Sequence, residues 1–442
     1  MAGVPSSLHE SIVIVGAGVF GLSTALALKE RGYSDITILD RELPPVRDGS
    51  STDISRIIRS DYLDPFYSRL ATEAIESWKS SNLFKPHYHP SGYMLTTEVK
   101  EDIYLEKNKE ILRGQKQTYR ELNDVAALKQ MIPGEDLKDL KYGYVNTNAG
   151  WADAAGAIRA LATHLAGLGV SFITGPRGTL QSLIVDDTGK KVLGVNVAQG
   201  SPIHASRVIL ATGAWTARYL DDLDYHITGS AQPLGFIQLT PEEGRRLANI
   251  PVSINTTSGV FLFPPSPGDN LLKVAYHGHG FEIETSAAHG DTGKDGVNLR
   301  VISVPQRDAN NAASKFFPED ADKYLRAGLR QLIPSIADRP WVKTRLCWYT
   351  ETPKGDFIAD YHHTLSGLFI ATGGSGHGFK FLPVLGRYIA DCFERTAVSD
   401  VRQRWKLPKP SPQKEKLQVN DGSRRGPPRR MLRREEQLRA NL

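Results

Sequence analysis

The sequence predicts an α/β fold in which a Rossmann-like domain, assembled from separated segments, joins a second, α+β domain with a mixed sheet. Three segments support this prediction, because each runs from an apolar strand into a glycine-rich turn: residues 11–40, 207–216 and 367–393. Strands buried on both faces of a parallel sheet are continuous apolar runs, as these are. Their wide spacing predicts one sheet built from distant parts of the chain.

The first segment has the order strand, helix, strand. Ile12–Val15 is a run of β-branched residues, a helical pattern follows it as far as Gly32, and Ile36–Leu39 is a second apolar run. Such a unit places two parallel strands side by side, joined by a right-handed crossover helix. Further elements are predicted later in the chain: a helix over 154–168 and strands over 170–173 and 192–197.

The glycines of this unit fit the pattern G-x-G-x-x-G in the context that gives it meaning. Gly16 permits the tight turn, Gly18 lets a pyrophosphate approach the helix N-terminus, where free N–H groups favour anions, and Gly21 lets helix and strand pack closely. Asp40 ends the second strand and would accept hydrogen bonds from ribose hydroxyls, which argues against a 2′-phosphate. The pattern predicts dinucleotide binding and leaves FAD and NAD open; the alternative is a tight turn that binds nothing.

We expect two domains and a tail. Residues 8–91, 145–230 and 346–400 are predicted to form the nucleotide-binding domain, and 92–144 and 231–345 a substrate domain packed over the cofactor. Residues 405–442 are rich in Pro, Lys and Arg with few large apolar side chains, a composition typical of disorder. The net charge is +5, of which +8 falls in 404–442, leaving −3 for the rest. The basic balance therefore belongs to the tail and does not indicate a nucleic-acid surface on the folded part.

The composition excludes several classes of protein. With 442 residues, 40% of them hydrophobic and 23% charged, the chain is globular. Cys347 and Cys392 are its two cysteines, too few for a disulfide framework or a cysteine-based zinc module. No apolar run reaches the roughly 18 residues of a membrane span, and the first residues do not resemble a secretory signal. We therefore expect an intracellular protein that binds neither membrane nor metal.

Four motifs, in order, carry a resemblance to a known family: the glycine unit at 11–40, DGSSTDISRIIRSDY at 48–62, LLKVAYH at 271–277, and RLCWYTETP at 345–353 with GGSGHGFKF at 373–381. Over about residues 10–395 the chain resembles the D-amino-acid oxidase superfamily of flavoenzymes. Within that superfamily it is similar to the group of monomeric sarcosine oxidase, pipecolate and saccharopine oxidase, and fructosyl-amino-acid oxidase (amadoriase). The resemblance implies that the dinucleotide is FAD.

The resemblance also assigns residues to the cofactor. Cys347 matches the cysteine that bonds through sulfur to the flavin 8α-methyl group; the alternative is a small buried hydrophobe, which is how we interpret Cys392. The glycine loop at 373–378 is expected against the flavin pyrimidine edge, where backbone N–H groups stabilise negative charge on reduced flavin. The other cofactor residues implied by the resemblance are Ser50, Ser51, Gly376 and Gly378.

Three basic residues are implied near the flavin and the substrate carboxylate. Arg56 and Arg59 lie three apart, and on a helical turn they would share a face. In similar enzymes the first arginine lies by the flavin ring and the second grips the carboxylate, which the planar guanidinium bonds bidentately. Lys380 is the residue paired with Arg59 on that carboxylate. The alternatives are a surface ion pair for Arg56 and a solvated lysine at a helix start.

The LLKVAYH motif reads as a strand, on which Lys273 and His277, four apart, face the same side. Lys273 matches the lysine that activates oxygen in sarcosine-oxidase-like enzymes, and His277 matches a histidine near the substrate amine. On residue types alone, an interface lysine and a hydrogen-bonded core histidine would be the better interpretations. Amadoriases carry an acid at position 277, so histidine favours a secondary amino acid over a sugar adduct. Phe261 stands where a sarcosine oxidase has tyrosine, which fits a different or larger substrate.

The resemblance thus implies an FAD-dependent amine oxidase that converts a secondary amino acid, such as sarcosine, pipecolate or saccharopine, to an imine while O2 becomes H2O2. The alternatives are an amadoriase, an amine-tailoring enzyme of secondary metabolism, a flavin dehydrogenase with another acceptor, and a flavin-loaded binding protein. We expect a monomer in the cytoplasm or, because the final Ala440-Asn441-Leu442 loosely resembles a peroxisomal address, in the peroxisome.

Overall fold

The predicted N-terminal unit is present in the computed structural model, which describes residues 7–220, 223, 226–288, 299–305, 316–409 and 422–439. Strand β1 (Ile12–Val15), helix α1 (Val19–Glu30) and strand β2 (Ile36–Leu39) follow one another. Strand β1 pairs in parallel with β2 on one side and with β13 (Arg207–Leu210) on the other. All four residues of β1 are buried, as its β-branched run predicts.

Distant segments complete this sheet. Its order is β22 (Ile358–Tyr361), β23 (Leu368–Thr372), β13, β1, β2 and β9 (Ser171–Ile173). Neighbouring strands are parallel except at one edge, where β22 runs antiparallel to β23. The prediction of one Rossmann-like sheet assembled from separated parts of the chain is confirmed.

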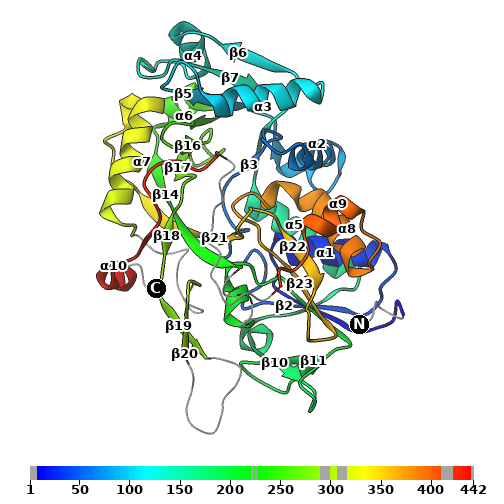
Figure 1. The fold of residues 1–442 in the computed structure, drawn as a ribbon. Helices are drawn as coiled ribbons and strands as arrows, with labels where there is room; N and C mark the ends of the chain where they lie inside the picture. Colours follow the sequence, from blue (N-terminus) through cyan, green and yellow to red (C-terminus); the bar gives the residue numbers. More distant parts are fainter. Residues whose placement is uncertain are drawn as a thin grey trace.

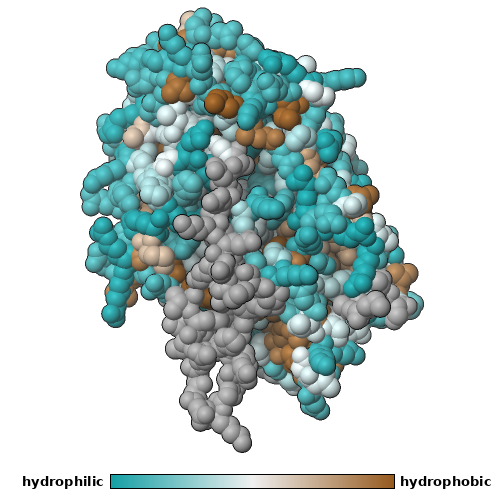
Figure 2. Space-filling view, viewed as in Figure 1, coloured by the Kyte–Doolittle hydropathy of each residue, from teal (hydrophilic) through white to brown (hydrophobic). Residues whose placement is uncertain are grey.

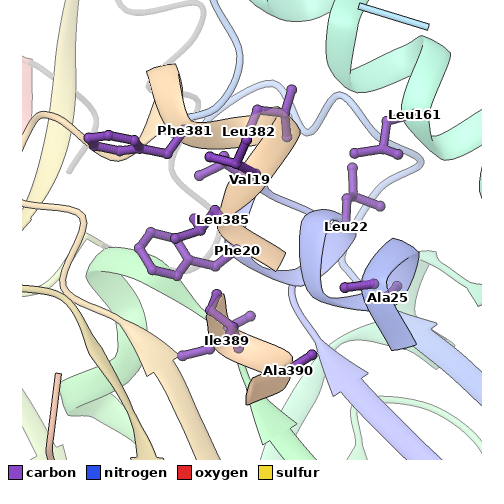
Figure 3. Close-up of a cluster of buried hydrophobic side chains, with 14 of the residues drawn as sticks. Val19, Phe20, Leu22, Ala25, Leu161, Phe381, Leu382, Leu385, Ile389 and Ala390 are labelled. Atoms are coloured by element: carbon purple, nitrogen blue, oxygen red, sulfur yellow. The ribbon is translucent and has the colours of Figure 1, made fainter. Parts of the chain in front are cut away.

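Helices α1 and α8 (Leu382–Phe393) pack closely on this sheet, although more than 350 residues separate them. Figure 3 shows Val19 and Phe20 of α1 beside Leu382 and Leu385 of α8. The backbones approach because the N–H of Gly386 donates to Ser23 Oγ at 2.6 Å, and Ser23 Oγ donates to the Leu382 carbonyl. The other helices on this side of the molecule are α2 (Pro65–Ser80), α5 (Ala154–Gly167) and α9 (Ser399–Arg404).

A larger mixed sheet forms the other half of the molecule (Figure 1). Its strands run in the order β24 (Arg430–Met431), β18 (Phe281–Glu282), β14 (Thr228–Gln238), β17 (Leu271–Tyr276), β16 (Val260–Leu262), β15 (Val252–Asn255), β5 (Tyr93–Thr97), β7 (Tyr142–Asn146) and β6 (Tyr119–Leu122), while β21 (Lys343–Glu351) pairs with β14. The helices beside it are α3 (Ile103–Gly114), α4 (Val125–Met131), α6 (Pro241–Leu247) and α7 (Glu319–Leu332). An α/β half with a mixed-sheet partner agrees with the predicted fold class.

Three short sheets accompany the two large ones. Strand β3 (Arg56–Ile58) pairs with β8 (Gly150–Ala152), which also pairs with β4 (Tyr88–His89). The others are β10 (Leu180–Val185) with β11 (Val192–Val197) and β12 (Ile203–His204), and β19 (Thr285–Ala288) with β20 (Leu299–Ile302). Short 3-10 turns at Lys85–His87, Gly175–Gly178, Gly213–Arg218, Pro334–Ile336 and Phe379–Phe381 link these elements.

The predicted division into two domains stays a prediction, but three of its boundaries fall inside strands. The boundaries at 144/145, 230/231 and 345/346 lie within β7, β14 and β21 of the larger sheet. These strands continue without a break because hydrogen bonds to their neighbours run past the predicted points. Strand β21 in particular is paired with β14 from residue 343 to residue 351.

The tail is the clearest difference from the sequence prediction. Residues 405–409 and 422–439 are folded against the body, whereas 410–421 and 440–442 lie outside the described residues. Trp405 is fully buried, and β24 extends the larger sheet by pairing with β18. The segment continues into α10 (Arg434–Arg439). The expectation of disorder is therefore wrong for the described part, because its arginines find carboxylates on the body, as Arg430 does with Asp320 at 2.8 Å.

The surface is largely polar on the face shown in Figure 2, where apolar residues form small separate groups. Among the described residues, no helix combines the length and apolar character that crossing a bilayer requires.

Candidate active site

The first of two adjoining cavities lies at the C-terminal ends of β1, β2 and β13, the usual ligand position in an open α/β sheet. Its empty volume is about 1260 Å³, the opening to solvent included. Val15, Leu39 and Ala211 line it from the strand ends. The predicted cofactor residues that line it are Gly16, Gly18, Asp40, Ser50, Ser51, Cys347, Gly376 and Gly378.

The glycine turn leaves no room for side chains. At Gly16, where φ is +114°, a Cβ would lie 2.3 Å from the Ala211 carbonyl oxygen, and at Gly18 it would lie 3.0 Å from Ser51 Oγ. Gly21 does not line the cavity, but a Cβ there would lie 1.9 Å from the Gly16 oxygen. Gly21 instead allows the helix and the strand to pack closely, as the motif predicts.

Two backbone amides of this turn already have partners in the protein. Ala17 N donates to Asp40 Oδ2 at 2.7 Å, and Val19 N donates to Ser51 Oγ at 2.9 Å. Burial raises the pKa of Asp40, although the hydrogen bond from Ala17 N and the charge of Arg41 oppose the rise. Ser50 Oγ donates to the Trp348 carbonyl. The two serines thus tie the loop after β2 to α1 and to β21, and this loop forms one wall of the cavity.

Cys347 lies on β21 beside a guanidinium. Arg56 Nη2 is 3.2 Å from Cys347 Sγ and donates to the Ser50 carbonyl at 2.7 Å. Burial alone would raise the pKa of the Cys347 thiol, but Arg56 and then Arg345 stabilise the thiolate more, so its pKa lies below the ordinary value. A thiolate is the nucleophilic form of cysteine. Cys392 has the opposite surroundings, because burial raises the pKa of its thiol to about 12.

The second cavity adjoins the first. Arg56, Tyr349, Gly376 and Phe379 line both, so they form the shared wall. It also contains the remaining predicted residues: Arg59, Lys273, His277 and Lys380. The expected helical turn at Arg56 and Arg59 is wrong, because Arg56–Ile58 is strand β3. Along a strand, residues three apart point to opposite faces. Strand β3 ends at Ile58, so this alternation does not extend to Arg59, and both arginines line the cavity.

Arg59 and Lys380 meet at Tyr62, a residue the sequence interpretation did not single out. Lys380 Nζ donates to Tyr62 Oη at 2.7 Å, and the Arg59 guanidinium lies 4.8 Å from the centre of the Tyr62 ring. Arg59 Nη1 is buried and has no hydrogen-bond partner among the described residues. A buried charged donor without an acceptor is costly, so this atom indicates an anionic ligand.

Lys273 lies on β17, which pairs with β14 on the side opposite β21. Its Nζ donates to Asp53 Oδ2 at 2.6 Å and to the Ser55 carbonyl at 2.7 Å. Burial lowers the pKa of Lys273 to about 8, against the attraction of Asp53. Burial would raise the pKa of Asp53, but Lys273 and then Arg56 lower it to about 2. Asp53 stands within the 48–62 motif, yet nothing in the sequence alone shows that it meets Lys273.

His277 is contacted by a residue of the C-terminal tail. Its Nε2 lies 3.1 Å from the hydroxyl of Ser423, in the tail predicted to be disordered, and Arg424 lines the same cavity. Burial, followed by the positive charges of Arg424, Arg59 and Lys380, lowers the pKa of His277 well below its ordinary value. The imidazole is therefore neutral at pH 7. No local signal in the sequence indicates the contribution of the tail.

Comparison with known proteins identifies the family. Residues 11–392 match the family described as DAO, FAD dependent oxidoreductase. The chain belongs to this family. This FAD-dependent oxidoreductase is 30% identical to the L-saccharopine oxidase of Schizosaccharomyces pombe over 90% of this chain and 92% of that one. It is 25% identical to a monomeric sarcosine oxidase of Bacillus sp., over 87% and 92% of the two chains. The fructosyl peptide oxidase structure from E. terrenum superposes with a TM-score of 0.86 at 28% identity, over 97% of each chain.

The residues present fit FAD. At Gly16 and Gly21 side chains would collide with backbone, so the glycine turn gives a pyrophosphate close access to the N-terminus of α1, and the cavity extends from this turn to Cys347. Gly374, Gly376 and Gly378 bring a backbone loop against the same cavity near Cys347. Within the described parts of the oxidoreductase, no group of three His, Cys, Asp or Glu is placed to hold a metal ion.

Proposed function

We propose that this FAD-dependent oxidoreductase oxidises the C–N bond of a secondary amino acid to an imine, with O2 reduced to H2O2. The observation that carries the proposal is Arg59 Nη1, a buried cationic donor without a partner, in a cavity that shares a wall with the dinucleotide cavity. A carboxylate is the acceptor that such a guanidinium binds best. Arg59 and Lys380 would hold it between them, beside Tyr62.

His277 would contact the substrate amine. A neutral imidazole accepts a hydrogen bond from an amine N–H, and burial, followed by the positive charges around His277, lowers its pKa and keeps it neutral. These same charges make the cavity a better host for an anionic amino acid than for a cationic amine. The imine leaves the cavity and hydrolyses in water.

FAD, when bound, supplies the acceptor for the substrate's hydride equivalent and the reductant for oxygen. We propose that it is attached through Cys347 Sγ, whose thiolate is favoured by Arg56. Lys273 would stabilise the negative charge that develops on oxygen, because a buried ammonium in a dry site interacts strongly with such charge. Asp53 keeps that ammonium in place.

The names of the relatives support the substrate class, since they include saccharopine and sarcosine oxidases. Phe261 lines the second cavity and brings no hydroxyl to it, which suits a bulkier, more apolar N-substituent than methyl. The structural relatives named for fructosyl peptides make oxidation of fructosyl amino acids the second candidate. We also propose a monomer in the cytoplasm or peroxisome, which gel filtration and cell fractionation would check.

Anaerobic mixing with a panel of amines tests the proposal. The panel contains sarcosine, L-pipecolate, L-proline, L-saccharopine and a fructosyl amino acid. We expect at least one secondary amino acid to bleach the flavin absorbance, and added O2 to restore it with stoichiometric H2O2. Bleaching by the fructosyl compound alone would favour the second candidate. Bleaching by none of them would contradict both and support a flavin-loaded binding protein.

A further inference from the structure

The tail segment 422–432 is built into the substrate half of the molecule. Its backbone is held at both ends, because Tyr276 donates its hydroxyl to the Arg425 carbonyl and Leu432 N donates to the Glu282 carbonyl at 2.8 Å. Arg425 Nε donates to the Thr256 carbonyl at 2.8 Å. In Figure 1 the red C-terminal segment runs along the larger sheet, beside β18. Segment 422–432 is therefore held against the larger sheet by hydrogen bonds along its length.

Arg424 holds segment 422–432 beside the second cavity. Arg424 and Glu351 are 6% and 0% exposed, and Arg424 Nη2 lies 3.0 Å from Glu351 Oε1. The guanidinium also donates to the carbonyls of Ser375 at 3.0 Å and Gly278 at 3.2 Å. Breaking a buried pair leaves an uncompensated charge, which is strongly unfavourable. Residue 423 is thus held firmly next to the catalytic cavity.

Ser423 occupies this held position and contacts His277. The Ser423 hydroxyl is 3.1 Å from His277 Nε2, while His277 Nδ1 has no hydrogen-bond partner among the residues that the structure describes. A hydrogen bond from one nitrogen to a hydroxyl holds the ring orientation, and because a hydroxyl both donates and accepts it is compatible with either tautomer. If Nε2 carries the proton and donates to Ser423, then Nδ1 offers its lone pair.

We propose that Ser423 is a positioning residue for the reaction: it accepts a hydrogen bond from His277 Nε2–H, so that Nδ1 accepts one from the substrate amine N–H. The inference rests on the proposed function, because it assigns the geometry of the same site. It explains why a serine of the tail is held beside the cavity. The titratable and charged groups that face His277 are Arg59, Tyr349, His377, Lys380 and Arg424.

Rapid-reaction kinetics of the holoenzyme with its best amine test the proposal. Ser423→Ala should slow anaerobic flavin reduction about 10-fold, the size expected for one lost hydrogen bond, while Ser423→Thr, which restores a hydroxyl, should recover most of the rate. The affinity for an unreactive carboxylate should stay unchanged, because Arg59 and Lys380 are intact. Arg433→Ala, an exposed tail variant, should behave as wild type.

Several outcomes would overturn the inference. These are an unchanged reduction rate in Ser423→Ala, a Thr variant as slow as the Ala variant, or a fall in carboxylate affinity that matches the fall in rate. Nitrogen-15 spectra of labelled histidine give a readout that needs no turnover: His277 should be the Nε2–H tautomer in wild type and change in Ser423→Ala. The opposite tautomer in wild type would refute the inference. Failure of every amine to bleach wild-type flavin would instead refute the proposed function.

Discussion

Lys273 and Cys347 lie beside the shared wall of the cavities, and burial and charged neighbours together determine the pKa values of both side chains. Asp53 is the counter-ion of the Lys273 ammonium, and Arg56 stands between Asp53 and Cys347, 3.4 Å from one and 3.2 Å from the other. Burying charges is costly unless they are paired, so each of these groups depends on the others. The 48–62 motif supplies both Asp53 and Arg56, and the larger sheet supplies both Lys273 and Cys347.

Reoxidation of the flavin by O2 should slow as the pH rises through about 8. Lys273 has a pKa of about 8, so it is charged below that pH and neutral above it, and only the charged form stabilises developing negative charge. Lys273→Met should cut the reoxidation rate by more than about 100-fold and change substrate reduction much less. Stopped-flow traces of both half-reactions check this; equal losses would remove the role assigned to Lys273.

Cys347→Ser should leave FAD bound but releasable. Denaturing gels of wild-type protein should show flavin fluorescence on the protein band, and this variant should lose it. Cys392→Ser is the matched control, since Cys392 lies on α8 and outside both cavities. Fluorescence that persists in Cys347→Ser, or that vanishes in Cys392→Ser, would contradict the assignment.

Arg59→Lys keeps the charge and removes the planar fork. Its dissociation constant for a carboxylate ligand should rise about 10- to 100-fold, the range expected for a lost charged hydrogen bond. Titration of the flavin spectrum with the ligand measures it. Arg113→Lys, an exposed change on α3, serves as the control, and equal affinities of the two variants would count against the carboxylate site.

At the scale of elements, the strands and helices that follow simple patterns could be predicted, and those set by distant contacts could not. Strand β1, helix α1 and helix α5 match their apolar runs closely. Strand β3 differs, because pairing with β8 overrides the local spacing of its two arginines. Strand β24 could not be predicted from the sequence either, since two residues of a basic segment form a strand only by pairing with β18.

The contact between α1 and α8 depends on one glycine. A Cβ at Gly386 would lie 1.8 Å from the Ser23 carbonyl oxygen, so Gly386→Ala should lower the free energy of unfolding by about 1–3 kcal/mol, the usual cost of overpacking. Gly167→Ala, at the end of α5 with open space around its Cβ position, should instead raise stability by up to about 1 kcal/mol. Urea denaturation compares them; equal stabilities would contradict this packing.

At the scale of the whole molecule, the two sheets bring four separated motifs to one place. Most residues singled out from the motifs line the two cavities, because each motif is local, and the roles assigned to them stay predictions. The tail could not be predicted, because Ser423 and Arg424 acquire their surroundings only when the chain returns across the larger sheet. The composition of a segment indicates only how that segment behaves in isolation. Here Arg424 pairs with Glu351 and Ser423 contacts His277, and both partners lie in distant parts of the chain.

A crystal structure of the holoenzyme with an unreactive carboxylate, such as pyrrole-2-carboxylate, tests the central claim most directly. The account predicts continuous density from Cys347 Sγ to the isoalloxazine in the first cavity, and the carboxylate between Arg59 and Lys380 in the second. Flavin bound elsewhere, or a carboxylate that leaves Arg59 without a partner, would contradict it.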